Sequence, residues 1–363
     1  MYRFYDIENK VFLDSIWDRL YGGLWKDYNI DQGLLPRGET QKTANLFPSI
    51  IAIYPGYALN IHSLQLKEQL YYPTPVNADI NSFLSAAEQF FRGFANQKIG
   101  VHLSGGLDSS LIICLLKHLN IDFVAIGLTS NRYEFRTESV IQHKLLDYAE
   151  TGALINIDDY PFFSGLSDMP KHPIPDTFIK MHKANTALAN EFAKRGVTTV
   201  LTGQGGDTLF GEEVDNSCGY NIESVFKIPW EQEYIYGPLG IDLISFYADY
   251  NIINQIHSLR KGLGLDPRKL WCRNFFRGIL PSELADYCYT GNFFGYSTSG
   301  LVLAKRKIVD LFEEAYVYSS HPAFSMRAIK EFKENDLLNL SFQEYSRLCA
   351  KISIAVWYHA LFS

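Results

Sequence analysis

Between residues 103 and 110 the chain reads Leu103-Ser104-Gly105-Gly106-Leu107-Asp108-Ser109-Ser110. This stretch joins an apolar run at 99–103, typical of a short buried strand, to a pattern at 108–119 that is typical of a helix. Adjacent glycines allow positive φ and close approach of the backbone, so that successive N–H groups can converge on an anion. The N-terminus of the helix adds a partial positive charge, and the serine hydroxyls add donors. We therefore predict a phosphate-binding loop here.

The loop differs from a Walker A loop because it lacks the Gly-Lys-Ser/Thr ending. It carries an aspartate instead, and Asp108 could hold Mg²⁺ against a leaving pyrophosphate. The alternative is an ordinary glycine turn in which Asp108 caps the helix. The position of the loop between a strand and a helix favours nucleotide binding.

Strand and helix patterns alternate around this loop. The predicted strands are 99–103, 123–128, 153–157 and 198–201, and the predicted helices are 80–94, 108–119, 137–149 and 178–194. Such alternation with continuous apolar strands predicts an α/β fold, in which helices cover both faces of a parallel sheet. Residues beyond 215 are typical of helices and aromatic loops, and the N-terminal segment is short and β-rich. There, 49–54 and 57–61 flank Pro55-Gly56 in a pattern that predicts a hairpin.

A second glycine-rich loop follows the strand at 198–201. It reads Thr202-Gly203-Gln204-Gly205-Gly206-Asp207-Thr208-Leu209-Phe210-Gly211. The first loop resembles the pyrophosphatase loop of ATP pyrophosphatases, and the second resembles the corresponding loop of asparagine synthetases and their lactam-forming relatives. The resemblance covers roughly residues 80–360 and implies a fold of the adenine nucleotide α-hydrolase type.

The resemblance implies ATP and Mg²⁺ as cofactors. Because a parallel sheet brings its strand ends to one edge, Asp108 and Asp207 could share the metal ion. In such enzymes a substrate carboxylate attacks the α-phosphorus of ATP, and the resulting acyl-adenylate is then attacked by an amine. The residues expected to bind ATP are Leu103, Ser104, Gly105, Gly106, Asp108, Ser109, Ser110, Ile126, Gly127, Leu128, Gly203 and Gly205.

The expected catalytic residues are Gln204, Asp207 and Lys305. Relatives carry glutamate or tyrosine at the place of Gln204, and a neutral amide can orient a substrate but cannot act as a general base. The family lysine that follows a Leu-Pro segment falls here at Tyr289 or Thr290. Lys305 is our candidate for the missing charge, with a solvated helix face as the alternative.

Three basic residues and one acidic residue each allow a functional and a structural interpretation. Arg268, Lys269 and Arg273 lie on a predicted helix and are candidates for contact with phosphate, although they could equally cover apolar surface. Glu138 matches an acidic family position, and it could also simply offset the positive end of its helix.

The N-terminus lacks the cysteine nucleophile that glutamine-using relatives carry after the initiator methionine. Tyr2 stands there, and the first cysteine, Cys114, lies in an apolar helix that favours a core position. We therefore expect residues 1–78 to form a truncated β-rich segment that resembles the tail of an amidotransferase domain, and residues 79–363 to form the synthetase domain. Glutamine hydrolysis is not expected.

The expected function is that of an ATP-dependent carbon–nitrogen ligase. Its partners would be a small-molecule or peptide carboxylate and an amine, which is either ammonia or a group of the same substrate. The C-terminal layout resembles the macrolactam-forming cyclases of lasso peptides, so a lactam or isopeptide product and a peptide-delivering partner protein are further expectations. The alternatives are an ammonia-dependent asparagine synthetase-like enzyme, a tRNA-modifying ligase and a non-catalytic nucleotide-binding relative.

The amino-acid composition argues against several other classes of protein. The chain has 363 residues and a formal net charge of −7, which argues against broad attraction to nucleic acid. The five cysteines form no C-x-x-C pair, so neither a zinc ribbon nor a dithiol redox site is expected. No apolar run is long enough to span a membrane and no signal-peptide pattern is found, so a cytoplasmic location is expected.

Overall fold

The computed structural model describes residues 3–13, 16–21, 45–47, 49–53, 55–172, 175–211, 219–222, 229–266, 268–286, 294–319 and 322–363. The chain divides into two compact units. Unit 1 comprises Met1–Gln69, Tyr160–Lys183 and Phe293–Ser363, and unit 2 comprises Leu70–Asp159 and Ala184–Asn292. The domain boundary expected between residues 78 and 79 stays a prediction.

Unit 2 is built on a five-stranded parallel sheet with the order β11-β10-β7-β8-β9. The strands are β7 (Ile99–His102), β8 (Val124–Thr129), β9 (Thr151–Asn156), β10 (Thr199–Thr202) and β11 (Asp242–Ser245). In the middle strands Val101 pairs with Leu201 on one side and with Ala125 on the other, and all three side chains are fully buried. The predicted α/β class with a parallel sheet is therefore confirmed.

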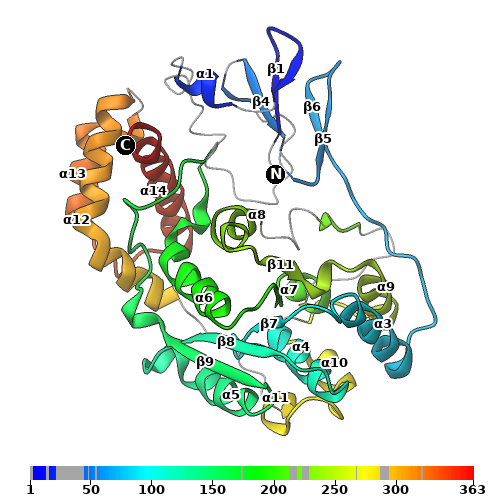
Figure 1. The fold of residues 1–363 in the computed structure, drawn as a ribbon. Helices are drawn as coiled ribbons and strands as arrows, with labels where there is room; N and C mark the ends of the chain where they lie inside the picture. The colour runs from blue at the N-terminus through cyan, green and yellow to red at the C-terminus, as the bar shows by residue number, and fades with distance from the viewer. Residues whose placement is uncertain are drawn as a thin grey trace. The chain divides into compact units, whose positions relative to one another are not determined.

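Helices cover both faces of this sheet (Figure 1). Helices α4 (Leu107–His118) and α5 (Arg136–Leu146) lie on one face, and α6 (His182–Lys194) lies on the other. Gly100 lets α6 approach, because a Cβ at this position would lie 2.7 Å from ring carbons of Phe192. From β9 the chain passes through α6 to β10 on the other side of β7. The strand order therefore reverses between β7 and β10, and ligands bind beyond the carboxyl ends of strands at such a reversal.

The remaining helices of unit 2 surround this core. Helix α3 starts with a capping box between Asp79 and Ser82, and it buries Phe83 and Phe91 in the same apolar cluster as the sheet. The helical elements are α3 (Ile80–Arg92), η2 (Tyr133–Phe135), η3 (Ile157–Asp159), α7 (Gly206–Gly211), α8 (Pro229–Glu231), η6 (Gln232–Tyr236), η7 (Gly237–Leu239), η8 (Phe246–Ala248), α9 (Tyr250–Arg260), α10 (Leu270–Phe275) and α11 (Ser282–Asp286).

The β-rich part of unit 1 differs from its prediction. Strands β1 (Arg3–Asp6), β2 (Val11–Leu13), β3 (Asn45–Phe47) and β4 (Ile50–Ile53) form an antiparallel sheet with the order β2-β1-β4-β3, whereas β5 (Tyr57–Asn60) pairs with β6 (Gln65–Glu68). The hairpin predicted around Pro55-Gly56 is therefore wrong, although both of its strands exist. All four residues of β4 are buried, and β4 has a partner strand on each side.

The helical elements of unit 1 in the described ranges are α1 (Trp17–Tyr21), η4 (Thr177–Met181), α12 (Phe294–Tyr318), η9 (Pro322–Phe324), α13 (Met326–Glu334) and α14 (Phe342–Phe362). Helix α14 starts with a capping box between Ser341 and Glu344. Its Trp357 is fully buried and donates from Nε1 to the carbonyl of His172. None of the helices in the described ranges is long and apolar enough to cross a membrane.

Candidate functional site

The loop after β7 has the geometry of an anion-binding turn. Gly105 has φ of +82°, and a Cβ there would lie 2.5 Å from the carbonyl oxygen of Glu138, so only glycine fits without strain. The hydroxyl oxygens of Ser104 and Ser109 lie 2.6 Å apart, and Gly106 N–H donates to the Ser104 hydroxyl. Gly106 is also the N-cap of α4 and has no side chain to cap it. The first turn of α4 thus presents its N–H groups to the loop.

The end of the neighbouring strand β8 lies directly beside this loop. Leu103 N–H donates to the carbonyl of Ile126, and Gln142 Nε2 then donates to the carbonyls of both Leu103 and Leu128. A Cβ on Gly127 would lie 2.1 Å from the Leu103 carbonyl oxygen, so glycine is needed there too. The Ile126 side chain is fully buried, and its carbonyl is the acceptor for Leu103 N–H.

The second loop interlocks with the first. A Cβ on Gly203 would lie 2.7 Å from the backbone nitrogen of Ser109, and one on Gly206 would lie 2.4 Å from Cγ of Asp108. Gly205 has φ of +86°. The structure therefore brings the two sequence motifs into direct contact at the point where the strand order reverses.

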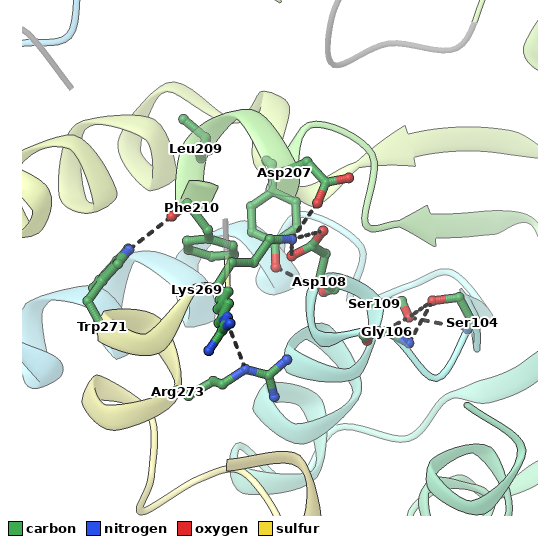
Figure 2. Close-up of polar contacts among 12 residues, drawn as sticks. Ser104, Gly106, Asp108, Ser109, Asp207, Leu209, Phe210, Lys269, Trp271 and Arg273 are labelled. Carbon is green, nitrogen blue, oxygen red and sulfur yellow. Dashed lines mark hydrogen bonds and ion pairs between the residues drawn. The ribbon is translucent and has the colours of Figure 1, made fainter. Parts of the chain in front are cut away.

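Lys269 joins the two loops (Figure 2). Its Nζ lies 2.6 and 2.7 Å from the carboxylate oxygens of Asp108 and 2.6 Å from Oδ1 of Asp207. Burial raises the pKa of Asp108 to about 6; Lys269 opposes this shift and Asp207 adds to it. Burial lowers the pKa of Lys269, but the two carboxylates outweigh this effect and raise it overall, so Lys269 remains charged.

Both carboxylates thus face the ammonium group of Lys269. Two carboxylates that face one cation are also an arrangement that fits Mg²⁺. Magnesium prefers hard oxygen ligands and keeps several water or phosphate oxygens. Within the described ranges no group of three or more histidine, cysteine, aspartate or glutamate side chains could hold a metal ion. Asp108 and Asp207 would therefore supply two ligands, and a bound nucleotide and water would supply the others.

Three residues that belong to neither loop motif donate hydrogen bonds that hold the two loops in place. Tyr247 Oη donates to the backbone carbonyl of Asp108. Arg260 Nη1 and Trp271 Nε1 donate to the carbonyls of Leu209 and Phe210, the orphan acceptors at the end of α7. Sequence reasoning assigned none of these three residues to the support of the loops, and it considered Trp271 only as an aromatic residue of a cleft or of the core.

The other predicted cations take different places. Arg273, a candidate for phosphate contact, is buried and donates to the backbone carbonyls of Arg268 and Leu284. Arg268 itself is exposed. Lys305 lies on α12 in unit 1, where its Nζ donates to the carbonyl of Asn335.

Three of the remaining predicted residues, Gln204, Ser110 and Glu138, lie in or against the two loops. Gln204 is in the second loop, and its carbonyl accepts a hydrogen bond from Ser245 Oγ. Ser110 is fully buried inside the first turn of α4. Glu138 is buried on α5, with its backbone against Gly105. Tyr289 and Thr290 lie outside the described residues.

Two interlocked glycine-rich loops at the strand reversal of a parallel sheet are features of nucleotide-binding α/β proteins. Residues 92–232 match the family model "Asparagine synthase". The matched stretch contains both glycine-rich loops.

Two individual proteins are also similar. One is named as a candidate glutamine-hydrolysing asparagine synthetase 2 of Methanocaldococcus jannaschii, with 28% identity over 132 residues. The match covers 36% of this chain and 25% of that protein, so the chain spans about a quarter of the length of this relative. The other is the structure of NMN synthetase from Francisella tularensis, with 10% identity, a TM-score of 0.33, and coverage of 72% of this chain and 96% of that one. That likeness is too distant to support an inference.

Proposed function

We propose that the chain is an ATP-dependent ligase that forms amide bonds through an acyl-adenylate. The observation that carries this proposal is the contact between the two loops, which directs Asp108 and Asp207 at a single cation. The stretch that matches the asparagine synthase model contains both loops, which supports the same chemistry.

In this proposal the residues of the site position the reactants and neutralise charge. The N–H groups of the first loop and of the α4 N-terminus bind phosphate oxygens. Asp108 and Asp207 would hold Mg²⁺, which when bound offsets the negative charge of the leaving pyrophosphate. Lys269 supplies further positive charge beside them, and Gln204 orients the substrate by hydrogen bonding. The attacking oxygen is already an ionised carboxylate, so this first step needs no general base.

The amine would come from free ammonia or from the carboxylate substrate itself. An internal amine would give a lactam or a macrocyclic isopeptide, and this is the product class we propose; it would need a peptide-delivering partner if the substrate is a peptide. An ammonia-dependent synthetase is the second candidate. Lys269 speaks against a non-catalytic relative. It supplies a positive charge to the two carboxylates, although Tyr289 or Thr290 stands at the position of the family lysine.

The products of ATP test the reaction class. Purified protein with Mg²⁺, ATP, ammonium and candidate acids should release AMP and pyrophosphate in equal amounts, and mass spectrometry of the adenylated acid should identify the substrate. Release of ADP and phosphate instead would show that the proposed mechanism is wrong.

Asp108→Asn tests the metal site. The change removes a carboxylate charge while keeping the shape of the side chain, so we expect turnover to fall by at least about 100-fold. Asp122→Asn is the matched control, because Asp122 is exposed in the same unit. Near-normal turnover of Asp108→Asn would remove Asp108 from the metal site.

A further inference from the structure

We propose that Lys269 holds the position of the metal ion in the nucleotide-free protein. It would release the two carboxylates only when a triphosphate draws its ammonium group away. The inference rests on the proposed function, because it concerns the order in which metal and nucleotide reach the same site.

The first observation is the position of the ammonium group. The Nζ of Lys269 lies at nearly equal distances, 2.6 to 2.7 Å, from oxygens of both aspartates. Figure 2 shows it between the two carboxylates. Mg²⁺ would need the same oxygens at about 2.1 Å. The ammonium group and the metal ion therefore compete for one position and cannot hold it together.

The second observation is the backbone of Lys269. Its φ is +54° and its ψ is +39°, a left-handed conformation that non-glycine residues seldom adopt. Two hydrogen bonds hold the turn: Lys269 N–H donates to the carbonyl of Asp266, and Arg273 N–H donates to the carbonyl of Lys269. Strain of this kind persists where the surrounding structure fixes it, often at functional sites. The turn directs the side chain towards the loops, while its flexible stem lets the ammonium group move without the backbone.

The third observation is the difference in exposure between the two aspartates. The Asp108 side chain is 17% exposed, whereas that of Asp207 is 91% exposed. A nucleotide with its metal ion would therefore meet Asp207 first, and the phosphates would compete for the ammonium group from that side. Before the exchange, one cation faces two carboxylates. Afterwards, the metal ion faces the carboxylates and the lysine faces phosphate, so every charge keeps a partner.

The experiment measures metal binding without nucleotide, by thermal unfolding and by Mn²⁺ electron paramagnetic resonance. Wild-type protein should respond weakly to Mg²⁺ or Mn²⁺ alone, because Lys269 occupies the position. Lys269→Met removes the competitor, so its affinity for Mn²⁺ alone should rise at least about 10-fold, and the metal alone should raise its Tm. Lys98→Met is the matched control, since Lys98 is exposed on the same unit, and it should behave as wild type.

A second measurement covers the case in which Lys269→Met folds poorly. In the wild type, a non-hydrolysable ATP analogue should increase the affinity for Mn²⁺ strongly; in Lys269→Arg, whose bulkier and less mobile cation should be exchanged less readily, the increase should be smaller. Equal responses of the wild type and both variants would overturn the inference. The products of ATP are measured separately: release of AMP and pyrophosphate by a protein whose lysine variants bind metal normally would sink this inference and leave the proposed function standing. An altered metal response without any AMP would do the reverse.

Discussion

At the scale of single residues, glycines decide how closely the two loops approach. Gly206 lies against the carboxylate of Asp108, and Gly203 lies against the backbone of Ser109. A side chain at either position would push the second loop away from the first. The relative position of Asp108 and Asp207 therefore depends on the absence of two Cβ atoms.

We predict that Gly206→Ala weakens catalysis more than folding. The added methyl group would displace the Asp108 carboxylate, and displacements of about 1 Å can cost about 100-fold in rate. We expect at least about a 10-fold loss in AMP formation with a smaller change in Tm. Gly278→Ala is the control, because a Cβ at Gly278 meets nothing within 4 Å. Wild-type rates for Gly206→Ala would contradict the interlocking of the loops.

Sequence reasoning predicted the two loops but not the partner of their aspartates. Each loop is a local motif, whereas Asp108 and Lys269 are 161 residues apart. Lys269 could be proposed as a phosphate contact because it is a cation on a predicted helix. Lys269 pairs with both carboxylates because its backbone makes a left-handed turn and because α10 packs beside α7. The left-handed turn gave no signal in the sequence.

At the scale of elements, the parallel sheet was predictable because four of its five strands are short apolar runs that alternate with helical patterns. The pairing of the N-terminal strands was not predictable, because a turn sequence such as Pro55-Gly56 signals a reversal but does not determine the partner strand. The buried strand β4 pairs instead with β1 and β3. The edge strand β11 was missed, since four residues starting with Asp242 carry little apolar signal.

We predict that one buried histidine makes unit 1 sensitive to acid. His172 is 1% exposed, its Nδ1 donates to the Pro170 carbonyl, and its own carbonyl accepts from Trp357 of α14. Burial lowers its pKa from 6.5 to about 4. Because the folded state disfavours the charged form, stability is full above pH 6.5 and falls as the pH drops towards 4, by up to about 1.4 kcal/mol per pH unit.

The test compares chemical unfolding at pH 7.5, 6, 5 and about 4. His172→Asn keeps a side-chain donor but does not titrate, so its free energy of unfolding should depend less on pH in this window. His118→Asn, at an exposed position, is the control and should keep the wild-type slope. A wild-type slope in His172→Asn would show that another group is responsible.

At the scale of the whole molecule, the chain is acidic, but individual buried cations lie at or beside the candidate site. The formal net charge is −7, yet a buried lysine, Lys269, stands at the centre of the candidate site, and a buried arginine, Arg260, supports the second loop. A site of this kind suits phosphates that are drawn into a confined position rather than a long polyanion, which would need a broad basic surface.

The cysteines of the chain bear on the source of the nitrogen that enters the amide bond. Glutamine hydrolysis by a cysteine requires a reactive thiolate. The cysteines of the described ranges, Cys114, Cys272 and Cys349, are all buried. Burial raises the pKa of each of them, for Cys114 to about 12, so that at neutral pH all three remain thiols. Only Cys218 and Cys288 lie outside those ranges. We therefore expect the chain to use ammonium or an amine of its substrate, and not glutamine.

Isotope labelling distinguishes these sources. With Mg²⁺, ATP and the identified acid, ¹⁵N-ammonium should label the product of an ammonia-dependent reaction, and an internal amine should give an unlabelled ring. Amide-labelled glutamine should transfer no label and release no glutamate, in the wild type as in Cys114→Ala. Glutamate formed in step with AMP would contradict the prediction, and its loss on replacing Cys218 or Cys288 by alanine would identify the thiol responsible.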